Sequence, residues 1–176
     1  ASGEPQYAEL HRSWVDALAT VLRGRLAIDA AHLVVLTEQP KNGELAGTAD
    51  NVRATFERLA KETKAEDLVF VMLIGHGSGD AAEAKFNLVG RDLTAVEWRA
   101  LFDPVPARLA VVDSTSSSFP FLAGLAGKNR IVITATNSFA QRYHTYFPAA
   151  FIQALASPDA DADKNGRVSL LEAFTY

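Results

Sequence analysis

Residues 68–77 read Leu-Val-Phe-Val-Met-Leu-Ile-Gly-His-Gly, an unbroken apolar run that ends in two glycines around one histidine. A strand with one exposed face would alternate apolar and polar residues, whereas this run is apolar at every position. The pattern is typical of a strand inside a parallel sheet that helices cover on both faces. The glycines predict a sharp turn at the carboxyl end of that strand.

Helical and strand patterns alternate along the rest of the chain. Further strands are expected at residues 32–36, 109–112 and 131–135, and helices at 7–22, 48–59, 94–101, 119–125 and 147–156. Thr48 is a good N-cap, and Thr94 with Glu97 predicts a capping box. This order predicts an α/β fold, a three-layer α/β/α sandwich with a mostly parallel sheet.

Composition limits the classes of protein to which the chain can belong. With 176 residues, 48% of them hydrophobic, we expect a single domain over residues 1–176. The net charge of −4 argues against a nucleic-acid partner, because phosphate binding needs a concentrated basic surface. No apolar run approaches the roughly 20 residues that span a bilayer. The start at Ala1-Ser2-Gly3 and the end inside a helical pattern lead us to expect truncation at both ends.

Two loops follow buried strands and carry candidate catalytic groups. Because ligands gather beyond the carboxyl ends of parallel strands, His76 is placed to act as a general acid or base. The alternative is a glycine-rich turn in which His76 only caps a carbonyl group. The second loop, residues 113–118, reads Asp-Ser-Thr-Ser-Ser-Ser and offers hydroxyl groups and amides at the same edge. Its alternative role is to cap the next helix through serine or threonine side chains.

The order of these features resembles the caspase-like and legumain-like clan of cysteine peptidases, including its bacterial members. An apolar strand ending in Gly-His-Gly is followed by a hairpin-like segment, a helix, and a strand ending in Asp-Ser-x-x-Ser. The resemblance covers residues 68–176 and implies a caspase-like fold with a His-Cys dyad that cuts peptide bonds. It places His76 at the catalytic histidine, Gly77 at the oxyanion-hole amide and Thr115 at the nucleophilic cysteine.

The chain departs from that family in three respects. It has no cysteine, so the nucleophile is absent. Ser118 stands where the family has a glycine. The family's fold usually opens with an apolar strand, whereas this sequence begins at the turn that would follow it, so we expect either that the strand lies upstream or that the sheet loses one member. The thiolate carries the chemistry of the clan, and a secondary alcohol is a far weaker nucleophile that also crowds the line of attack.

From these departures we expect a pseudopeptidase that acts by binding or scaffolding through the former substrate cleft. Its partner would be a peptide or protein. One alternative is an active endopeptidase that uses Thr115 or a nearby serine together with His76. Another is a cysteine peptidase inactivated by a substitution at residue 115. A third is a small-molecule-binding α/β module without hydrolase ancestry, which a wide separation of His76 and Thr115 would favour.

Residues 161–172 read Asp-Ala-Asp-Lys-Asn-Gly-Arg-Val-Ser-Leu-Leu-Glu and fit the EF-hand calcium loop. The expected ligands are oxygen atoms of Asp161, Asp163, Asn165, Arg167, Ser169 and Glu172. Gly166 supplies the turn, and Val168 supplies the apolar position. The alternatives are an acidic surface loop or one that folds without metal. A structural Ca²⁺ ion would stay bound in millimolar calcium, which favours a periplasmic or secreted location.

The remaining histidines suggest no site on their own. His11, His32 and His144 are far apart in the sequence and show no ligand spacing. Arg142, Tyr143 and His144 follow a predicted strand, so they are interpreted either as the border of a binding cleft or as a solvated loop.

Overall fold

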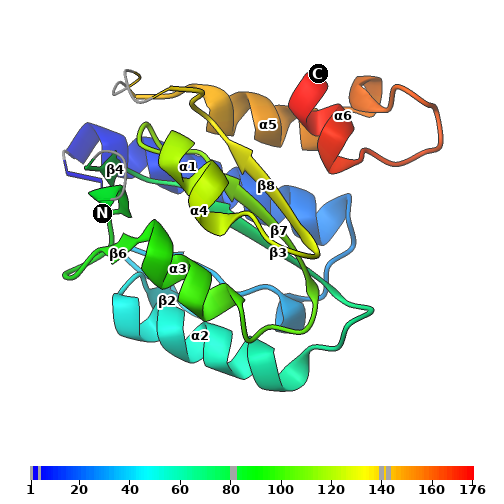
Figure 1. The fold of residues 1–176 in the computed structure, drawn as a ribbon. Coiled ribbons are helices and arrows are strands. Elements are labelled where there is room, and N and C mark those ends of the chain that lie inside the picture. Colours follow the sequence, from blue (N-terminus) through cyan, green and yellow to red (C-terminus); the bar gives the residue numbers. More distant parts are fainter. Residues whose placement is uncertain (1, 4, 80–82, 139–140, 142–143) are drawn as a thin grey trace.

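The computed structural model describes residues 2–3, 5–79, 83–138, 141 and 144–176. In chain order its principal elements are α1 (Pro5–Gly24), β1 (Leu36–Thr37), β2 (Leu45–Ala46), α2 (Ala49–Glu62), β3 (Leu68–Leu73), β4 (Gly77–Ser78), β5 (Lys85–Phe86), β6 (Leu93–Thr94), α3 (Ala95–Phe102), β7 (Arg108–Asp113), α4 (Phe119–Leu125), β8 (Arg130–Thr134), α5 (Phe147–Ala156) and α6 (Leu170–Thr175) (Figure 1). Short 3₁₀ turns lie at Ala30–His32 and Pro158–Ala160.

The main sheet is parallel, with the strand order β3-β7-β8. Its register pairs Leu73 with Asp113, and Asp113 with Thr134. The three strands therefore end side by side, and the loops that follow them emerge at one edge. This arrangement confirms the predicted strands at 68–74, 109–112 and 131–135. The predicted position of the first of them inside the sheet was wrong, because in the described sheet β3 is an edge strand and β7 is the central one.

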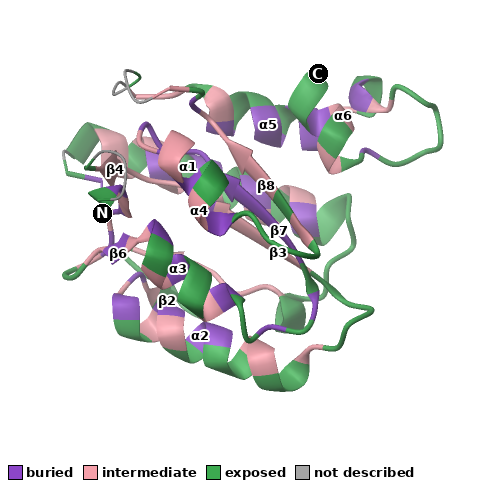
Figure 2. Cartoon of the chain, in the orientation of Figure 1, coloured by how far each residue is buried: buried purple, intermediate pink, exposed green. Residues whose placement is uncertain are grey.

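Helices cover both faces of this sheet. On β3, Val69 and Val71 pack with the core formed by α2, α3 and α4. Phe70 and Met72, which point the other way, pack with the core formed by α1 and α5. Strand β7, which lies between β3 and β8 in the sheet, is almost wholly buried (Figure 2). The fold is therefore a mixed α/β sandwich, because an apolar strand without alternation needs cover on both faces.

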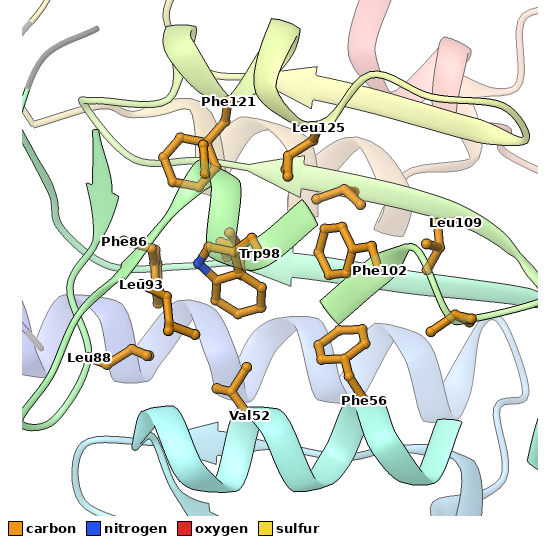
Figure 3. Close-up of a cluster of buried hydrophobic side chains, with 14 of the residues drawn as sticks. Val52, Phe56, Phe86, Leu88, Leu93, Trp98, Phe102, Leu109, Phe121 and Leu125 are labelled. Carbon is orange, nitrogen blue, oxygen red and sulfur yellow. The ribbon is translucent and has the colours of Figure 1, made fainter. Parts of the chain in front are cut away.

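Aromatic side chains fill the core beneath α2, α3 and α4 (Figure 3). Phe56 of α2 packs on Phe102 of α3 with ring centroids 5.0 Å apart, and Trp98 is 3% exposed. The predicted caps are confirmed: Thr48 accepts a hydrogen bond from the amide of Asn51, and Thr94 forms its capping box with Glu97.

The strand predicted at 32–36 was wrong in extent. Residues 30–32 form a 3₁₀ turn, and of the predicted residues only Leu36 joins a strand, β1, which pairs with β2. The two form a separate pair, apart from the main sheet. The hairpin-like segment is a small antiparallel sheet, β4-β5-β6. No helix in the described parts of the chain is long and apolar enough to cross a membrane.

Candidate functional site

The two loops predicted to carry chemistry meet at the carboxyl edge of β3 and β7. Gly77 lies so close to the second loop that a Cβ added to it would be 2.6 Å from Thr115 Oγ1 and 2.9 Å from Ser117 Cβ. Ser114, which follows β7, donates its hydroxyl hydrogen to the carbonyl oxygen of Leu73, at 2.6 Å. The second loop is thus bonded to the end of β3, and the residues that follow β3 pack on it.

Thr115 is buried and its hydroxyl group is isolated. The residue is 1% exposed, and among the described residues its Oγ1 atom has no hydrogen-bond partner. Its amide donates to Asp113 Oδ1 at 3.0 Å, which fixes the backbone of the loop. A serine or threonine hydroxyl needs an adjacent base to become a nucleophile. Among the described residues, the Thr115 hydroxyl group makes no hydrogen bond to a base.

Asp113 is fully buried at the end of β7. Burial raises the pKa of this carboxyl group to about 6, against the smaller opposing effect of the hydrogen bond from Thr115. In the part of the chain that the structure describes, its Oδ2 atom has no hydrogen-bond partner. A carboxyl group in this setting favours its protonated form, since a buried charge without a counter-ion is costly.

Hydroxyl groups tie the end of the second loop to the end of β8. Ser118 and Thr136 are buried, and their hydroxyl oxygens lie 3.0 Å apart. Thr136 Oγ1 accepts a hydrogen bond from the amide of Phe119, the first residue of α4, at 2.9 Å. Ser118, the N-cap residue, makes no capping bond with its own side chain. For Ser118, therefore, the predicted capping role is wrong, because Thr136, which follows β8, accepts the hydrogen bond from the Phe119 amide.

His76 lies against α1. Its ring contacts Tyr7 and His11 edge to face, with centroids 5.0 and 5.3 Å apart. A Cβ added to Gly3 would lie 3.7 Å from His76 Cδ2, so the segment before α1 also reaches the ring. The imidazole is partly covered by α1 and its preceding segment.

The sequence did not predict that His11 and His144 would lie together beside His76. Both rings belong to one cluster with Tyr7, since His144 stacks on Tyr7 at 5.2 Å and faces His11 at 6.1 Å. His11 could have been assigned to the inner face of α1, because it shares helical spacing with Trp14 and Leu18. His144 carries no such signal. Arg142 and Tyr143, the other residues of the predicted cleft border, lie outside the described residues.

The acidic loop before α6 brings three of its predicted ligands together. Oxygen atoms of Asp161, Asp163 and Glu172 lie within 4.8 Å of one another, and this triad could hold a metal ion. The amides of Asn165 and Gly166 donate to the Asp161 carboxylate at 3.0 and 2.8 Å, and Gly166 has a positive φ of 84°.

The other predicted ligands occupy the same loop. Asn165 Oδ1 accepts from the amide of Arg167 at 2.9 Å, and Ser169 caps α6 in a capping box with Glu172. The expected helix before the loop ends at Ala156, and a 3₁₀ turn leads from there into the loop. The donor atoms are hard oxygens. Calcium prefers ligands of this type, whereas transition metals favour nitrogen and sulfur ligands.

A cavity of about 230 Å³ lies away from both loops, at the opposite edge of the sheet. Its lining includes Leu109 and Arg130, which stand at the amino ends of β7 and β8. Arg130 forms an ion pair of 2.7 Å with Asp103 there. This ion pair connects the carboxyl end of α3 to the first residue of β8.

Comparison with protein-family models, with curated proteins and with solved structures finds no match to this chain.

Proposed function

We propose that this chain is a calcium-binding pseudopeptidase with a caspase-like or legumain-like architecture. It would hold a peptide or protein ligand at the carboxyl edge of the sheet without cutting it. The observation that carries the proposal is the contact between Gly77 and Thr115, the positions that correspond to the family's oxyanion amide and nucleophile.

Three features of the site explain why peptide cleavage would be lost. The Thr115 hydroxyl is buried and has no hydrogen-bonded base in the described structure. The imidazole of His76 packs against Tyr7 and His11. An alcohol is also far less reactive than the thiolate of the clan. In triad enzymes the loss of one member costs about 10⁴- to 10⁶-fold in turnover.

The experiment that tests this ancestry is a thiol substitution at residue 115. Thr115→Cys restores the nucleophile beside the Gly-His-Gly loop, so we expect cleavage of a peptide library where the parent chain gives none. The double variant Thr115→Cys with His76→Ala should lose that cleavage. Ser116→Cys is the matched control, because it places a thiol one residue away. A folded Thr115→Cys protein that cuts nothing, or cuts no better than Ser116→Cys, contradicts the ancestry.

The metal proposed for the acidic triad is Ca²⁺, held by carboxylates of Asp161, Asp163 and Glu172 with further oxygens from Asn165, Arg167 and Ser169. Bound there, the ion would fix α6 and the loop before it. Isothermal titration should show one Ca²⁺ site, with a dissociation constant of about 0.1–1 mM if the loop resembles extracellular modules. Such an affinity fits a protein that works in a periplasmic or secreted setting.

A matched pair of variants tests the assignment of the ligands. Glu172→Gln removes a carboxylate of the triad and should weaken calcium binding at least tenfold. Asp159→Asn removes a neighbouring exposed carboxylate outside the triad and should leave binding unchanged. Equal weakening by both variants would mean that the ion responds only to the general negative charge of this surface.

A further inference from the structure

Three histidines from distant parts of the chain meet beside α1. His11 lies on α1, His76 follows β3, and His144 precedes α5. Ring centroids are 5.3 Å apart for His11 and His76, and 6.1 Å apart for His11 and His144. The ring of Tyr7 contacts the rings of His76 and His144, with centroids 5.0 and 5.2 Å apart. The amino end of α1 and the loop after β3 therefore lie together through these rings (Figure 1).

His11 has little capacity to accept a positive charge. His11 is 8% exposed, and the Nε2 atom of His144 is buried without a hydrogen-bond partner among the described residues. Burial, with His76 and His144 close by, lowers the pKa of His11 to about 4. A second proton would place two cations within a few ångströms of one another, in surroundings that water screens poorly.

Among the described residues, Glu38 is the carboxylate whose charge acts on His11. Glu38 opposes the lowering of the His11 pKa, but its carboxylate already accepts a hydrogen bond from the amide of Ser2 at 3.0 Å. Asp113 belongs to the neighbouring loop, and its pKa is raised by burial. Helix α5, which packs on α1, has no titratable residue over Phe147–Ala156. On the remaining sides the neighbours are the aromatic residues Tyr7, Trp14 and Tyr146.

We propose that His11, His76 and His144 form an acid-operated latch that holds the amino end of α1 against the loop after β3, at the carboxyl edge of the sheet. With neutral imidazoles the rings pack together and the latch is closed. When an imidazole nitrogen takes up a proton from solvent, the cluster opens, and the segment that carries Gly3 and Tyr7 moves off His76. Acid would thus uncover the candidate site without unfolding the sheet.

The direction of the pH effect follows from linkage. The folded, closed state holds His11 at a pKa of about 4, and an exposed histidine has a pKa near 6.5. The closed state is therefore fully favoured above pH 6.5 and loses its advantage as the pH falls from 6.5 toward 4. This latch does not depend on the proposed function, because it concerns the position of α1 and not what the site binds.

Trp14 is a built-in reporter of the latch. Its ring lies 5.6 Å from His11 and 5.3 Å from His144, and a protonated imidazole quenches indole fluorescence. Trp98→Phe leaves Trp14 as the single tryptophan, and it removes an indole N–H that has no hydrogen-bond partner in the described structure. In this background we expect a reversible fluorescence change between pH 6.5 and 4.

Hydrogen exchange in the same pH window separates opening from unfolding. Amides of residues 5–16 should exchange at least tenfold faster at pH 5 than at pH 7.5, after correction for the intrinsic rate. Amides of β7 should keep their protection. Loss of protection in β7 together with α1 would mean global acid unfolding and would overturn the proposal.

Variants identify the histidines responsible. His11→Phe keeps a ring in the cluster and cannot be charged, so the fluorescence and exchange transitions should disappear or move by at least one pH unit toward acid. His144→Gln provides the same test if His11→Phe does not fold. His32→Gln is the control, because His32 is exposed and belongs to the 3₁₀ turn after α1. A transition that is unchanged in the cluster variants, or altered equally by His32→Gln, overturns the latch.

Discussion

Gly77 and Thr115 are in such close contact that no side chain can stand between them. A Cβ on Gly77 would lie 2.6 Å from Thr115 Oγ1 and 3.1 Å from Thr115 Cβ. This contact joins the loop after β3 to the loop after β7, and both strands end in register at Leu73 and Asp113. The glycine is required here by close packing.

Gly77→Ala should therefore destabilise the protein by about 1–3 kcal/mol, since the added methyl group overpacks a buried contact. Adding Thr115→Ala should restore part of that loss, because it removes the nearest atom. Urea unfolding of the two single variants and the double variant measures the coupling. Gly24→Ala is the control, since its Cβ would meet no atom within 4 Å. Additive effects within about 0.5 kcal/mol would contradict the contact.

Asp113→Asn should change how stability depends on pH. The folded pKa of Asp113 is raised to about 6 from 3.8, so the folded state binds the extra proton and the parent loses stability as the pH rises from 3.8 through 6. Asparagine does not titrate and keeps an oxygen for the Thr115 amide. Relative to the parent, the variant should gain about 1–3 kcal/mol between pH 4 and pH 7.

Urea unfolding at several pH values measures this difference. Contributions from other groups, including His11, are common to both proteins and cancel. Asp50→Asn is the control, because the Asp50 side chain is 95% exposed. A constant difference between Asp113→Asn and the parent across the pH range would show that burial does not perturb Asp113.

Thr136→Val should cost about 1–3 kcal/mol, because it leaves the Phe119 amide without its acceptor at the start of α4. Valine has nearly the same shape, so the loss reports the hydroxyl group. Thr136→Ser keeps that group and should cost less. The free energies of unfolding of the two variants decide the matter: equal values would show that the hydroxyl group contributes nothing.

Calcium should raise the melting temperature of the protein. An ion present at 100 times its dissociation constant stabilises the folded state by about 2.7 kcal/mol. For a domain of this size that corresponds to a rise of about 5–10 °C. Differential scanning calorimetry in calcium, and again after addition of a chelator, measures the shift. Magnesium at the same concentration should give a smaller rise, and equal rises for both ions would argue against an EF-hand-type site.

The architecture was largely predictable from local patterns. The apolar runs 68–74, 109–112 and 131–135 predict the strands β3, β7 and β8, of which β7 is the most buried, and Thr94 with Glu97 predicts a helix start. The strand prediction for residues 32–36 was wrong because a β-branched run favours an extended backbone but does not determine which strand it pairs with. Only tertiary contacts decide that β1 pairs with β2 and stays apart from the main sheet.

The candidate site was predictable where its residues are close in sequence or follow neighbouring parallel strands. The acidic residues of 161–172 lie in one short loop, so spacing alone placed three of their carboxylates together. The contact between His11 and His144 depends on how α1 lies relative to α5, which no local pattern encodes. The same holds for Thr136, which supplies the hydrogen bond that a serine of the loop was expected to make.

The central claim is that the hydroxyl group at residue 115 is not a nucleophile, and peptide hydrolysis by the unmodified chain tests it most directly. The measurement is cleavage of a diverse peptide library in millimolar calcium, with His76→Ala assayed beside the parent. The account predicts that neither protein cleaves above the buffer rate. Cleavage by the parent that disappears in His76→Ala would contradict it and identify a hydroxyl-dependent peptidase.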